Sequence, residues 1–481
     1  MTTYDFPGHH AFLNRERELA LLREWYEDPG ADPVLVLYGR RRSGKSWLFR
    51  EFAHGLEADI LVCDRRVVRD QLAGFATQLT SKLEVRPQLN TATDLFQVIF
   101  GLGRRRRCLV VLDEFPELFG SRGTPDSELA AVLEEQLGRT QAKLILCGSQ
   151  IATMTRLLRA RSPLHGRARQ LLVKPLDFVQ ARTFLGSHNG ADLIRRYALA
   201  GGMPRYLSLF GRTGSLKQIA CSALLDPRGA LFDEPRTVLE MELPEPAVHF
   251  SLLTALAAHK ELAYGDLLSE SKVDDKVASR YLQALEQLFL VEAANPIFST
   301  ATARRRRYRV ADHLTRFWFR FVFPFQQDLD AGLEPGAHWD RSVAPHLDEH
   351  VAATFEQICR AWTLRTYATT TDRVGAWWGL SRHDLRRRGQ RTSEEIDIVG
   401  GRDRLVTVIG EVKWTNRPMR KRTLDDLREL KVPALAQSGV EVSGAEVVLF
   451  SRSGFDEDLL AEATAGRIRL VGLDELLFGL R

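Results

Sequence analysis

The most constraining feature of the sequence is one glycine-rich stretch near its start. The residues that fit the pattern GxxxxGK[ST] are Gly39, Arg40, Arg41, Arg42, Ser43, Gly44, Lys45 and Ser46. An apolar run at residues 34–38 precedes the stretch, and a helical pattern that opens with Trp47 follows it. Glycines in this context let backbone N–H groups surround phosphates, whose charge the start of a helix favours. We therefore expect Lys45 to reach the β- and γ-phosphates of a nucleotide and Ser46 to bind Mg²⁺.

Two further apolar runs end in polar side chains. Residues 108–112 are followed by Asp113 and Glu114, and residues 144–147 lead to Ser149. Short apolar strands that alternate with helices indicate a parallel sheet, and ligands bind where the carboxyl ends of its strands meet. We expect Asp113 to hold the water shell of Mg²⁺ and Glu114 to polarise the attacking water as general base. Ser149 would contact the γ-phosphate or that water, or would simply end its strand.

These motifs belong to an ordered series. In chain order the series comprises residues 12–19 (FLNREREL), 39–46 (GRRRSGKS), 110–115 (VVLDEF), 147–150 (CGSQ), 163–167 (PLHGR) and 201–205 (GGMPR). Together these motifs resemble the archaeal-type ATPase family of the STAND class, signal-transduction ATPases related to the AAA+ fold. The resemblance covers about residues 10–310. Arg167 and Arg205, in the last two motifs, are candidates for stabilising charge in the transition state.

The resemblance implies ATP as the bound nucleotide and a helical lid over it. It also implies that Arg15 lies near the nucleotide and that Pro204 sits where the lid meets it. Asn14 stands where glycine is commoner in the family, and His165 stands where tyrosine is usual. Both departures concern the adenine side of the site rather than the phosphates.

The pattern changes between residues 246 and 310. Three helical segments are expected at 247–259, 264–270 and 275–290, followed by two wing strands at 290–293 and 308–310 with Arg304–Arg307 between them. This order predicts a winged helix-turn-helix. Its third helix would expose the side chains of Lys276, Ser279, Arg280 and Gln283. The module would read DNA with this helix or would serve as an internal packing unit.

The last third of the chain carries a second group of charged side chains. Asp397 lies in an expected strand at 395–399, and Glu411 and Lys413 lie in the next strand, at 405–414. Alternation along a strand places Glu395 with Asp397 on one face and points Ile396 and Ile398 into a core. A turn at 400–403 can pair the two strands antiparallel, so that Asp397, Glu411 and Lys413 converge. Two carboxylates bind a hard cation such as Mg²⁺, and the lysine can orient water or offset phosphate charge.

This pattern resembles the PD-(D/E)xK nuclease superfamily, with Asp397 and Glu411-x-Lys413 as its signature. The resemblance implies that Asp397, Glu411 and Lys413 are catalytic. Asp397 and Glu411 would bind the metal together with Glu356, the extra acidic residue on the preceding helix. A charged hairpin formed by chance and an intact nuclease fold without activity are the alternatives.

We therefore predict an α/β protein of four domains. They are a P-loop NTPase core with a parallel sheet (residues 10–175), a helical lid (176–242), a winged helix-turn-helix (243–312) and an α/β restriction-endonuclease-like domain (313–481). The sequence has five cysteines without a CxxC pair, no signal peptide and no apolar run long enough for a membrane helix. These features favour the cytoplasm and no membrane association. The net charge of +5 says little about partners.

The leading functional hypothesis is an ATP-binding and ATP-hydrolysing switch that controls a metal-dependent, nuclease-like domain acting on DNA. Basic residues near the second site could contact DNA phosphates, namely Arg386, Arg387, Arg388, Arg391, Arg417, Arg420, Lys421 and Arg422. The second hypothesis is an ATP-regulated DNA-binding regulator or scaffold with an inert nuclease fold. The third is a partner-assembling ATPase without a DNA role. A protein partner or a second copy of the chain stays open in each.

Overall fold

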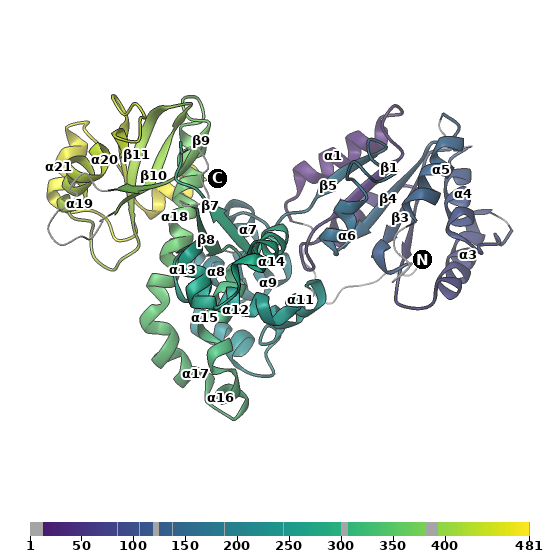
Figure 1. Ribbon diagram of the computed structural model, residues 1–481, viewed down its shortest axis with the longest axis horizontal. Helices are drawn as coiled ribbons and strands as arrows, with labels where there is room; N and C mark the ends of the chain where they lie inside the picture. The colour runs from purple at the N-terminus through teal and green to yellow at the C-terminus, as the bar shows by residue number, and fades with distance from the viewer. Residues whose placement is uncertain are drawn as a thin grey trace. The chain divides into compact units, whose positions relative to one another are not determined.

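The computed structural model describes residues 13–83, 85–104, 106–118, 125–136, 138–186, 188–243, 245–299, 306–380 and 393–480 (Figure 1). The predicted basic residues Arg304, Arg305, Arg386–Arg388 and Arg391 lie outside this part of the chain. The chain forms two compact units. One is Met1–Leu176 with Met203–Arg205, and the other is Asp177–Gly202 with Tyr206–Arg481. The division into four domains stays a prediction.

The first unit is built on a five-stranded sheet in the order β2-β3-β4-β1-β5. Its strands are β1 (Val34–Tyr38), β2 (Ala58–Val62), β3 (Cys108–Asp113), β4 (Ala142–Gly148) and β5 (Ala168–Leu172). All neighbouring pairs are parallel, which confirms the predicted parallel sheet. Because β1 and β3 both flank β4, the carboxyl ends of these three strands are adjacent at one edge of the sheet.

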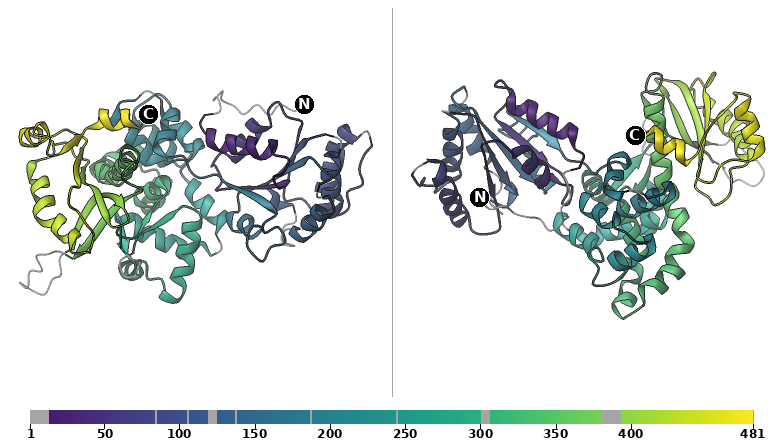
Figure 2. Two further views of the ribbon diagram at one scale, coloured as in Figure 1. Left: turned by 90° about the horizontal axis from the view of Figure 1, so that it is seen from above. Right: turned by 180° about the vertical axis from the view of Figure 1, so that it is seen from behind.

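Helices cover both faces of this sheet (Figure 2). They are α1 (Glu16–Glu27), α2 (Lys45–Ala53), α3 (Val68–Leu83), α4 (Ala92–Leu102), α5 (Asp126–Gln136) and α6 (Ile151–Arg156), with a short 3-10 turn, η1 (Phe115–Glu117). On one face, Trp25 of α1 and Phe49 of α2 pack against alternate strand residues such as Leu35 and Val111. Burial of such side chains contributes about 1.5–3 kcal/mol each and fixes the helices on the sheet.

The second unit begins with helices and a small antiparallel sheet. Its first helices are α7 (Phe178–Leu185), α8 (Gly190–Ala200), α9 (Pro204–Phe210, of which Pro204 and Arg205 belong to the first unit), α10 (Leu216–Ala220), η3 (Cys221–Leu225) and α11 (Glu234–Glu242). Next come α12 (Pro246–Ala258), β6 (Leu262–Ala263), α13 (Tyr264–Ser271), α14 (Asp275–Gln287), β7 (Val291–Ala294) and β8 (Arg307–Val310). Strand β8 pairs antiparallel with both β6 and β7. The predicted third helix is three residues too long, because Phe289 adopts a left-handed backbone with φ 55°, which a continuing helix does not allow.

An aromatic helix and a long helix lead to the C-terminal part of this unit. The elements are α15 (His313–Phe321), η5 (Phe323–Phe325), α16 (Gln326–Asp330), α17 (Pro335–His338), η6 (Trp339–Val343), η7 (Ala344–His346) and α18 (Leu347–Thr366). Phe317, Trp318 and Phe319 are fully or almost fully buried. Within the residues that the structure describes, no helix has both the length and the apolar character to cross a membrane.

The C-terminal part has a mixed sheet in the order β13-β12-β11-β10-β9. Its elements are β9 (Arg373–Leu380), β10 (Ser393–Arg402), β11 (Leu405–Lys413), α19 (Lys421–Asp426), η8 (Leu427–Lys431), α20 (Val432–Ala436), β12 (Glu446–Ser451), α21 (Glu457–Thr464), β13 (Arg469–Val471) and α22 (Leu473–Gly479). The predicted antiparallel pairing of β10 with β11 is confirmed, and β12 continues the sheet parallel to β11. Helix α18 packs against β9, β10 and β11. Helix α19 and the η8 turn supply Leu424 and Leu427 to the core that contains Ile409.

Candidate functional sites

The glycine-rich loop joins the end of β1 to the start of α2. Arg42 and Gly44 have φ angles of 70° and 90°, so the chain bends sharply before the helix begins at Lys45. A side chain at Gly39 would bring its Cβ within 2.4 Å of the carbonyl oxygen of Val173. Glycine is therefore required at position 39 for the loop to lie against the end of β5.

The ammonium group of Lys45 lies inside this loop. Its Nζ donates hydrogen bonds to the carbonyl oxygens of Gly39, at 2.8 Å, and Arg40, at 2.9 Å. The residue is only 6% exposed. Burying a charge without partners is very unfavourable, so the two carbonyls hold the ammonium at the place where phosphate oxygens are expected.

The two predicted magnesium ligands lie side by side. The Ser46 hydroxyl donates to Oδ2 of Asp113 at 3.4 Å, across the adjacent ends of the loop and β3. Burial raises the pKa of Asp113, whereas hydrogen bonds from Cys147 and the backbone of Glu114 lower it. A hydroxyl and a carboxylate are oxygen donors of the kind that Mg²⁺ prefers, so these residues fit the ion in their chemistry.

The predicted general base, Glu114, is hydrogen-bonded to Ser149, the residue expected to contact the γ-phosphate or the attacking water. Ser149 donates to Oε2 of Glu114 from its hydroxyl, at 3.0 Å, and from its backbone N–H, at 3.3 Å. Glu114 has a left-handed backbone with φ 51° and lies between the end of β3 and η1. The carboxylate of the predicted general base is therefore already hydrogen-bonded by Ser149.

Arg15 lies beside the loop and is 5% exposed. Its guanidinium donates to the carbonyl oxygens of Ser43, at 3.1 Å, and Lys174, at 2.6 Å, and pairs with Glu18 at 2.8 Å. These contacts fasten the loop to the segment that follows β5. A Cβ at Gly44 would lie 3.5 Å from Pro204, so Pro204 lies next to the loop in the first unit. Arg167 instead pairs with Glu134 at the surface.

The acidic residues of the C-terminal part are buried. Asp397 is 8% exposed, Glu411 is 1% exposed and Glu356, on α18, is 7% exposed. The backbone N–H of Val412 donates to Oδ2 of Asp397 at 3.0 Å, which fixes this carboxylate against the neighbouring strand.

Ile396 and Ile398 are both fully buried, as expected, but β10 is not a regular strand. The register against β9 shifts between Ile396 and Val399, and both of these residues lie in one core cluster although they are three positions apart. A β-bulge inserts one extra residue and redirects the side chains within it. Asp397 lies inside this bulge, so the bulge determines where its carboxylate points.

Cations from several elements face these carboxylates. Lys431 lies 2.7 Å from Oε1 of Glu411, and Lys413 lies 3.6 Å from Oε2. Lys260 lies 2.9 Å from Oε1 of Glu356, and Arg360 lies 3.2 Å from Oε2. Both oxygens of each glutamate are therefore taken by intramolecular cations.

Three of these cations were missed by sequence reasoning. They are Lys260, which lies far in the chain from Asp397 and Glu411, and Arg360 and Lys431, which lie on helical segments without a recognisable motif. The scarcity of lysine was an available signal, because the chain has 11 lysines and three of them, Lys260, Lys413 and Lys431, lie at this site.

The pKa of Glu411 rises to about 7. Burial is the main cause, the charge of Asp397 adds to it, and Lys431 and Lys413 oppose it. Burial and Asp397 also raise the pKa of Glu356, against Lys260 and Arg360. Asp397 thus interacts electrostatically with both glutamates.

The oxygen donors suit a hard divalent cation, but they do not form a closed metal cage in this arrangement. Over the part of the chain that the structure describes, no three His, Cys, Asp or Glu side chains are grouped so that they could hold a metal ion. The carboxylates are turned toward lysines and arginines instead.

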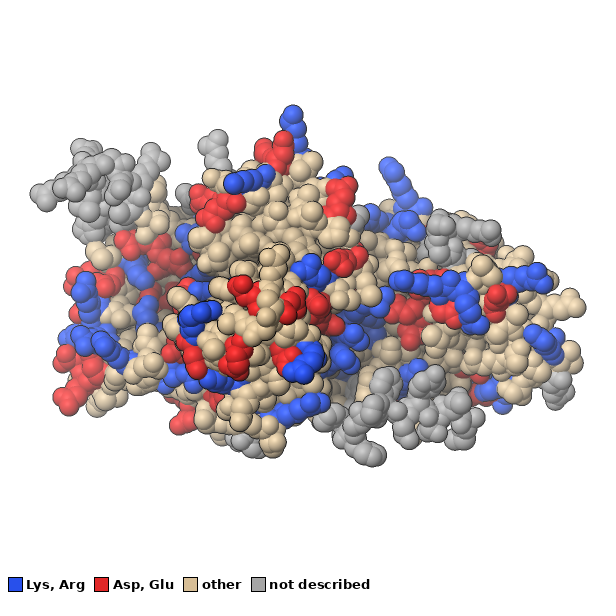
Figure 3. Space-filling view, turned by 90° about the horizontal axis from the view of Figure 1, so that it is seen from below, with Lys and Arg blue, Asp and Glu red and all other residues tan. Residues whose placement is uncertain are grey.

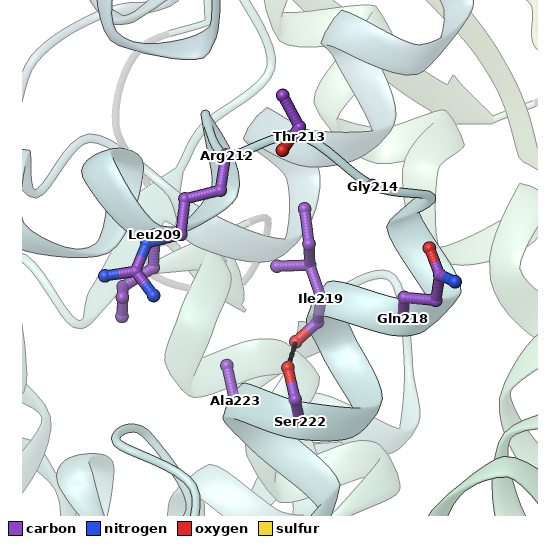
Figure 4. Close-up of a pocket in the computed structure, with 8 residues that line it drawn as sticks. All are labelled: Leu209, Arg212, Thr213, Gly214, Gln218, Ile219, Ser222 and Ala223. Carbon is purple, nitrogen blue, oxygen red and sulfur yellow. Dashed lines mark hydrogen bonds between the residues drawn. The ribbon is translucent and has the colours of Figure 1, made fainter.

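A separate hollow lies among helices α9 and α10 and the η3 turn (Figure 4). Its volume is about 210 Å³. The residues that line it are Leu209, Arg212, Thr213, Gly214, Gln218, Ile219, Ser222 and Ala223. None of them was predicted as a site residue, and the hydroxyl of Ser222 is bonded to the backbone of Ile219 at 3.2 Å.

Two family models match the chain. Residues 12–210 match an ATPase domain found predominantly in Archaea. This match supports a P-loop ATPase domain in the first part of the chain. Residues 318–425 match a family of archaeal and bacterial proteins of unknown function.

Three similar proteins come from archaea. An uncharacterised protein of Methanocaldococcus jannaschii is 26% identical over 440 residues, which cover 88% of this chain and 93% of that protein. A Walker-type ATPase of Pyrococcus abyssi is 20% identical with a TM-score of 0.49, over 64% of this chain and 96% of that chain. A STAND protein of Pyrococcus horikoshii with a tetratricopeptide repeat sensor is 16% identical with a TM-score of 0.32, over 76% of this chain and 52% of that chain.

The first prediction concerns the anchor of the phosphate loop in the ATPase domain. An Arg15→Gln substitution leaves carbonyl oxygens of Ser43 and Lys174 without their donors, which costs roughly 2–4 kcal/mol of unfolding free energy. We expect ATP affinity, measured by calorimetry, to fall about tenfold or more because the loop is less fixed. Arg17→Gln, at an exposed position two residues away, is the control. Unchanged affinity in Arg15→Gln would contradict the anchoring role.

The second prediction concerns the protonation of Glu411. Its pKa of about 7 means that the carboxylic acid form dominates at pH 6 and the carboxylate at pH 8. Infrared spectra of protein labelled with ¹³C-glutamate should show a carboxyl group that titrates near pH 7 and is absent in Glu411→Gln. Lys431→Met should move this titration to higher pH, because it removes a charge that lowers the pKa. A titration that stays in place after Lys431→Met would show that the ion pair is not formed in solution.

Proposed function

We propose that the chain is an ATP-hydrolysing switch in which nucleotide binding at residues 39–46 controls a metal-dependent, nuclease-like site acting on DNA. The observation that carries the nuclease part is the placement of Asp397 in a bulge beside buried Glu411, with Lys413 3.6 Å from that glutamate. The carboxylates of Asp397 and Glu411 repel each other, and a divalent cation bound between them would offset this repulsion. Their repulsion therefore favours a metal site there.

At the ATPase site, Lys45 and Glu114 would first have to give up the hydrogen bonds that they make within the chain. The Lys45 ammonium would leave the carbonyls of Gly39 and Arg40 and bind phosphate oxygens, which carry full negative charge. Mg²⁺, when bound near Ser46 and Asp113, would offset charge on the phosphates. Glu114 would accept a proton from the attacking water after Ser149 releases its carboxylate.

The order of elements in the C-terminal part supports a nuclease-like fold. Helix α18 precedes the antiparallel strands β9–β11, then a helical segment leads to β12, parallel to β11. The acidic residues come from α18, β10 and β11, at the positions that the PD-(D/E)xK resemblance implies. Lys413 would stabilise negative charge on a phosphate or orient water.

DNA binding would use the module between residues 246 and 310. Its three helices and three-stranded sheet have the order of a winged helix-turn-helix. Lys276, Ser279, Arg280 and Gln283 of α14 are exposed. On the face in Figure 3, basic and acidic side chains are interspersed, so DNA affinity would come from local contacts and fall with salt.

A continuous path would connect the nucleotide to Glu356. Met203–Arg205 belongs to the first unit and is joined to α8 of the second unit by Gly201 and Gly202. Arg195 of α8 donates to Asp348 of α18 at 3.1 Å, and His350 Nε2 lies 3.3 Å from the carbonyl oxygen of Ala198. A shift of α8 that follows nucleotide binding would therefore move the helix that carries Glu356.

Asp348 also reaches the end of the strand that carries the signature. It accepts hydrogen bonds from Trp414, at 3.1 Å, and from Arg452, at 2.9 Å. Trp414 directly follows Lys413 in the chain. Asp348 would therefore transmit movement of α8 to both sides of the acidic site.

One observation favours the alternative of an ATP-regulated, DNA-binding scaffold with an inert nuclease fold. Lys260, Arg360, Lys413 and Lys431 already neutralise the two glutamates. A site that is satisfied by its own chain needs no metal for stability. The protein would then bind DNA and ATP without cutting.

Cleavage assays separate these two functions. Single-stranded, duplex and branched DNA would be incubated with the full chain, ATP and Mg²⁺ or Mn²⁺. We expect ATP-dependent cleavage that falls at least 100-fold in Glu411→Gln, which removes a proposed metal ligand, and in Lys413→Ala, which removes a charge that would act on the reacting phosphate. Glu429→Gln, at an exposed position in η8, is the matched control.

The negative outcomes have different meanings. Salt-dependent DNA binding without cleavage under any of these conditions would overturn the nuclease proposal and favour the scaffold. Absence of DNA binding even at low salt, together with capture of a protein partner, would instead favour a partner-assembling ATPase.

A further inference from the structure

Lys260 reaches from one module into the acidic site of another. It lies between the end of α12 and the start of β6, in the 246–310 module. Its Nζ is 2.9 Å from Oε1 of Glu356 and 3.2 Å from Oε1 of Glu395. One ammonium group therefore bridges the long helix α18 and strand β10 of the C-terminal part.

The module is held along the edge strand β9 by other contacts. The backbone N–H of Ile297 donates to the carbonyl oxygen of Ala376 at 2.9 Å, and Ile297 and Phe298 pack against the C-terminal core. Arg307 lies 4.6 Å from the ring centroid of Trp378 and 2.9 Å from Oε2 of Glu395. The position of Lys260 thus follows from an interface with apolar, hydrogen-bonded and charged parts.

Lys260 has the electrostatic surroundings of a bound cation. Burial lowers its pKa, but the charges of Glu356, Glu395 and Asp397 together outweigh that effect and raise it. The group is therefore held as an ammonium ion among three carboxylates. Two of the three, Glu356 and Asp397, are residues that would bind the metal in the proposed site.

We infer that the Lys260 ammonium competes with a divalent cation for the Glu356–Asp397 side of the acidic site, so that the 246–310 module holds this site in a metal-poor state. The inference rests on the proposed metal site. It accounts for the absence of a metal-holding group of three such side chains among the described residues, since Glu356 faces Lys260 and Arg360 instead.

The carboxylates of Glu356 and Asp397 would become available to a metal ion if only the Lys260 side chain moved. The Lys260 side chain is 42% exposed, so its flexible stem has solvent on one side. The contacts of Ile297 and Arg307 can hold the module in place while the ammonium swings away. A metal ion that takes its place would restore the charge balance at Glu356 and Asp397.

Metal binding to the full chain tests this inference directly. Without nucleotide, Mn²⁺ would be titrated into the wild type, Lys260→Gln and the control Lys272→Gln, and binding followed by calorimetry and electron paramagnetic resonance. Lys272 is an exposed lysine of the same module. We expect Lys260→Gln to bind Mn²⁺ about tenfold more tightly, because the competing charge is gone. Lys260→Arg, which keeps a cation, should stay near the wild type, and Glu356→Gln should abolish the gain.

The rate at which Lys260 is chemically acetylated provides a second test of the competition, and this test does not depend on DNA cleavage. Binding linkage is reciprocal, so Mn²⁺ should release Lys260 and raise its rate of acetylation, measured by mass spectrometry. Lys272 should react at the same rate with and without the metal.

The outcomes separate this inference from the proposed function. Equal Mn²⁺ affinity in the wild type and Lys260→Gln, with binding still lost in Glu411→Gln, would overturn the competition and leave the metal site standing. Absence of Mn²⁺ binding in every variant would overturn the metal site itself and the competition with it.

Discussion

A charge that is removed from water must be matched by a partner, and this constraint shapes both candidate sites. The Lys45 ammonium is held by two loop carbonyls, and Glu114 is held by Ser149. At the other site, the oxygens of Glu356 and Glu411 face lysine and arginine side chains. Each group that chemistry would need is therefore already engaged within the chain. A ligand must replace an internal partner before either site can work.

Such exchanges suit a switch, because a broken contact is replaced by another of similar strength. Net free energies for swapping partners of a buried charge are small compared with the cost of leaving that charge unpaired. The internal ion pairs of the acidic site fit two alternatives. They suit a site in which a metal ion replaces the lysines and arginines, and they equally suit an inert nuclease fold that binds no metal. Asp348 would give the proposed switch a physical route, because it joins α8, α18 and the residue after Lys413 through Arg195 and Trp414.

The sequence predicted local features well and long-range partners poorly. The phosphate loop and the β10–β11 hairpin depend on nearby residues, so their spacing was enough to place them. The apposition of Ser46 and Asp113 follows from strand order in a parallel sheet. The bulge around Asp397 escaped prediction because strand periodicity assumes a regular ladder. Lys260 and Lys431 escaped it because their pairing with Glu356 and Glu411 depends on tertiary packing, not on any motif.

We propose above all that the loop at residues 39–46 binds a triphosphate. Its phosphate oxygens would replace the carbonyl oxygens of Gly39 and Arg40 as partners of the Lys45 ammonium. Calorimetric titration of ATP with Mg²⁺ into the wild type and into Lys45→Ala tests it most directly. The control is Lys272→Ala, because Lys272 is exposed. Lys143→Ala is not a suitable control, because Lys143 is buried. The account predicts saturable binding in the wild type and in Lys272→Ala and loss of binding in Lys45→Ala. Full ATP affinity in a folded Lys45→Ala protein would contradict it.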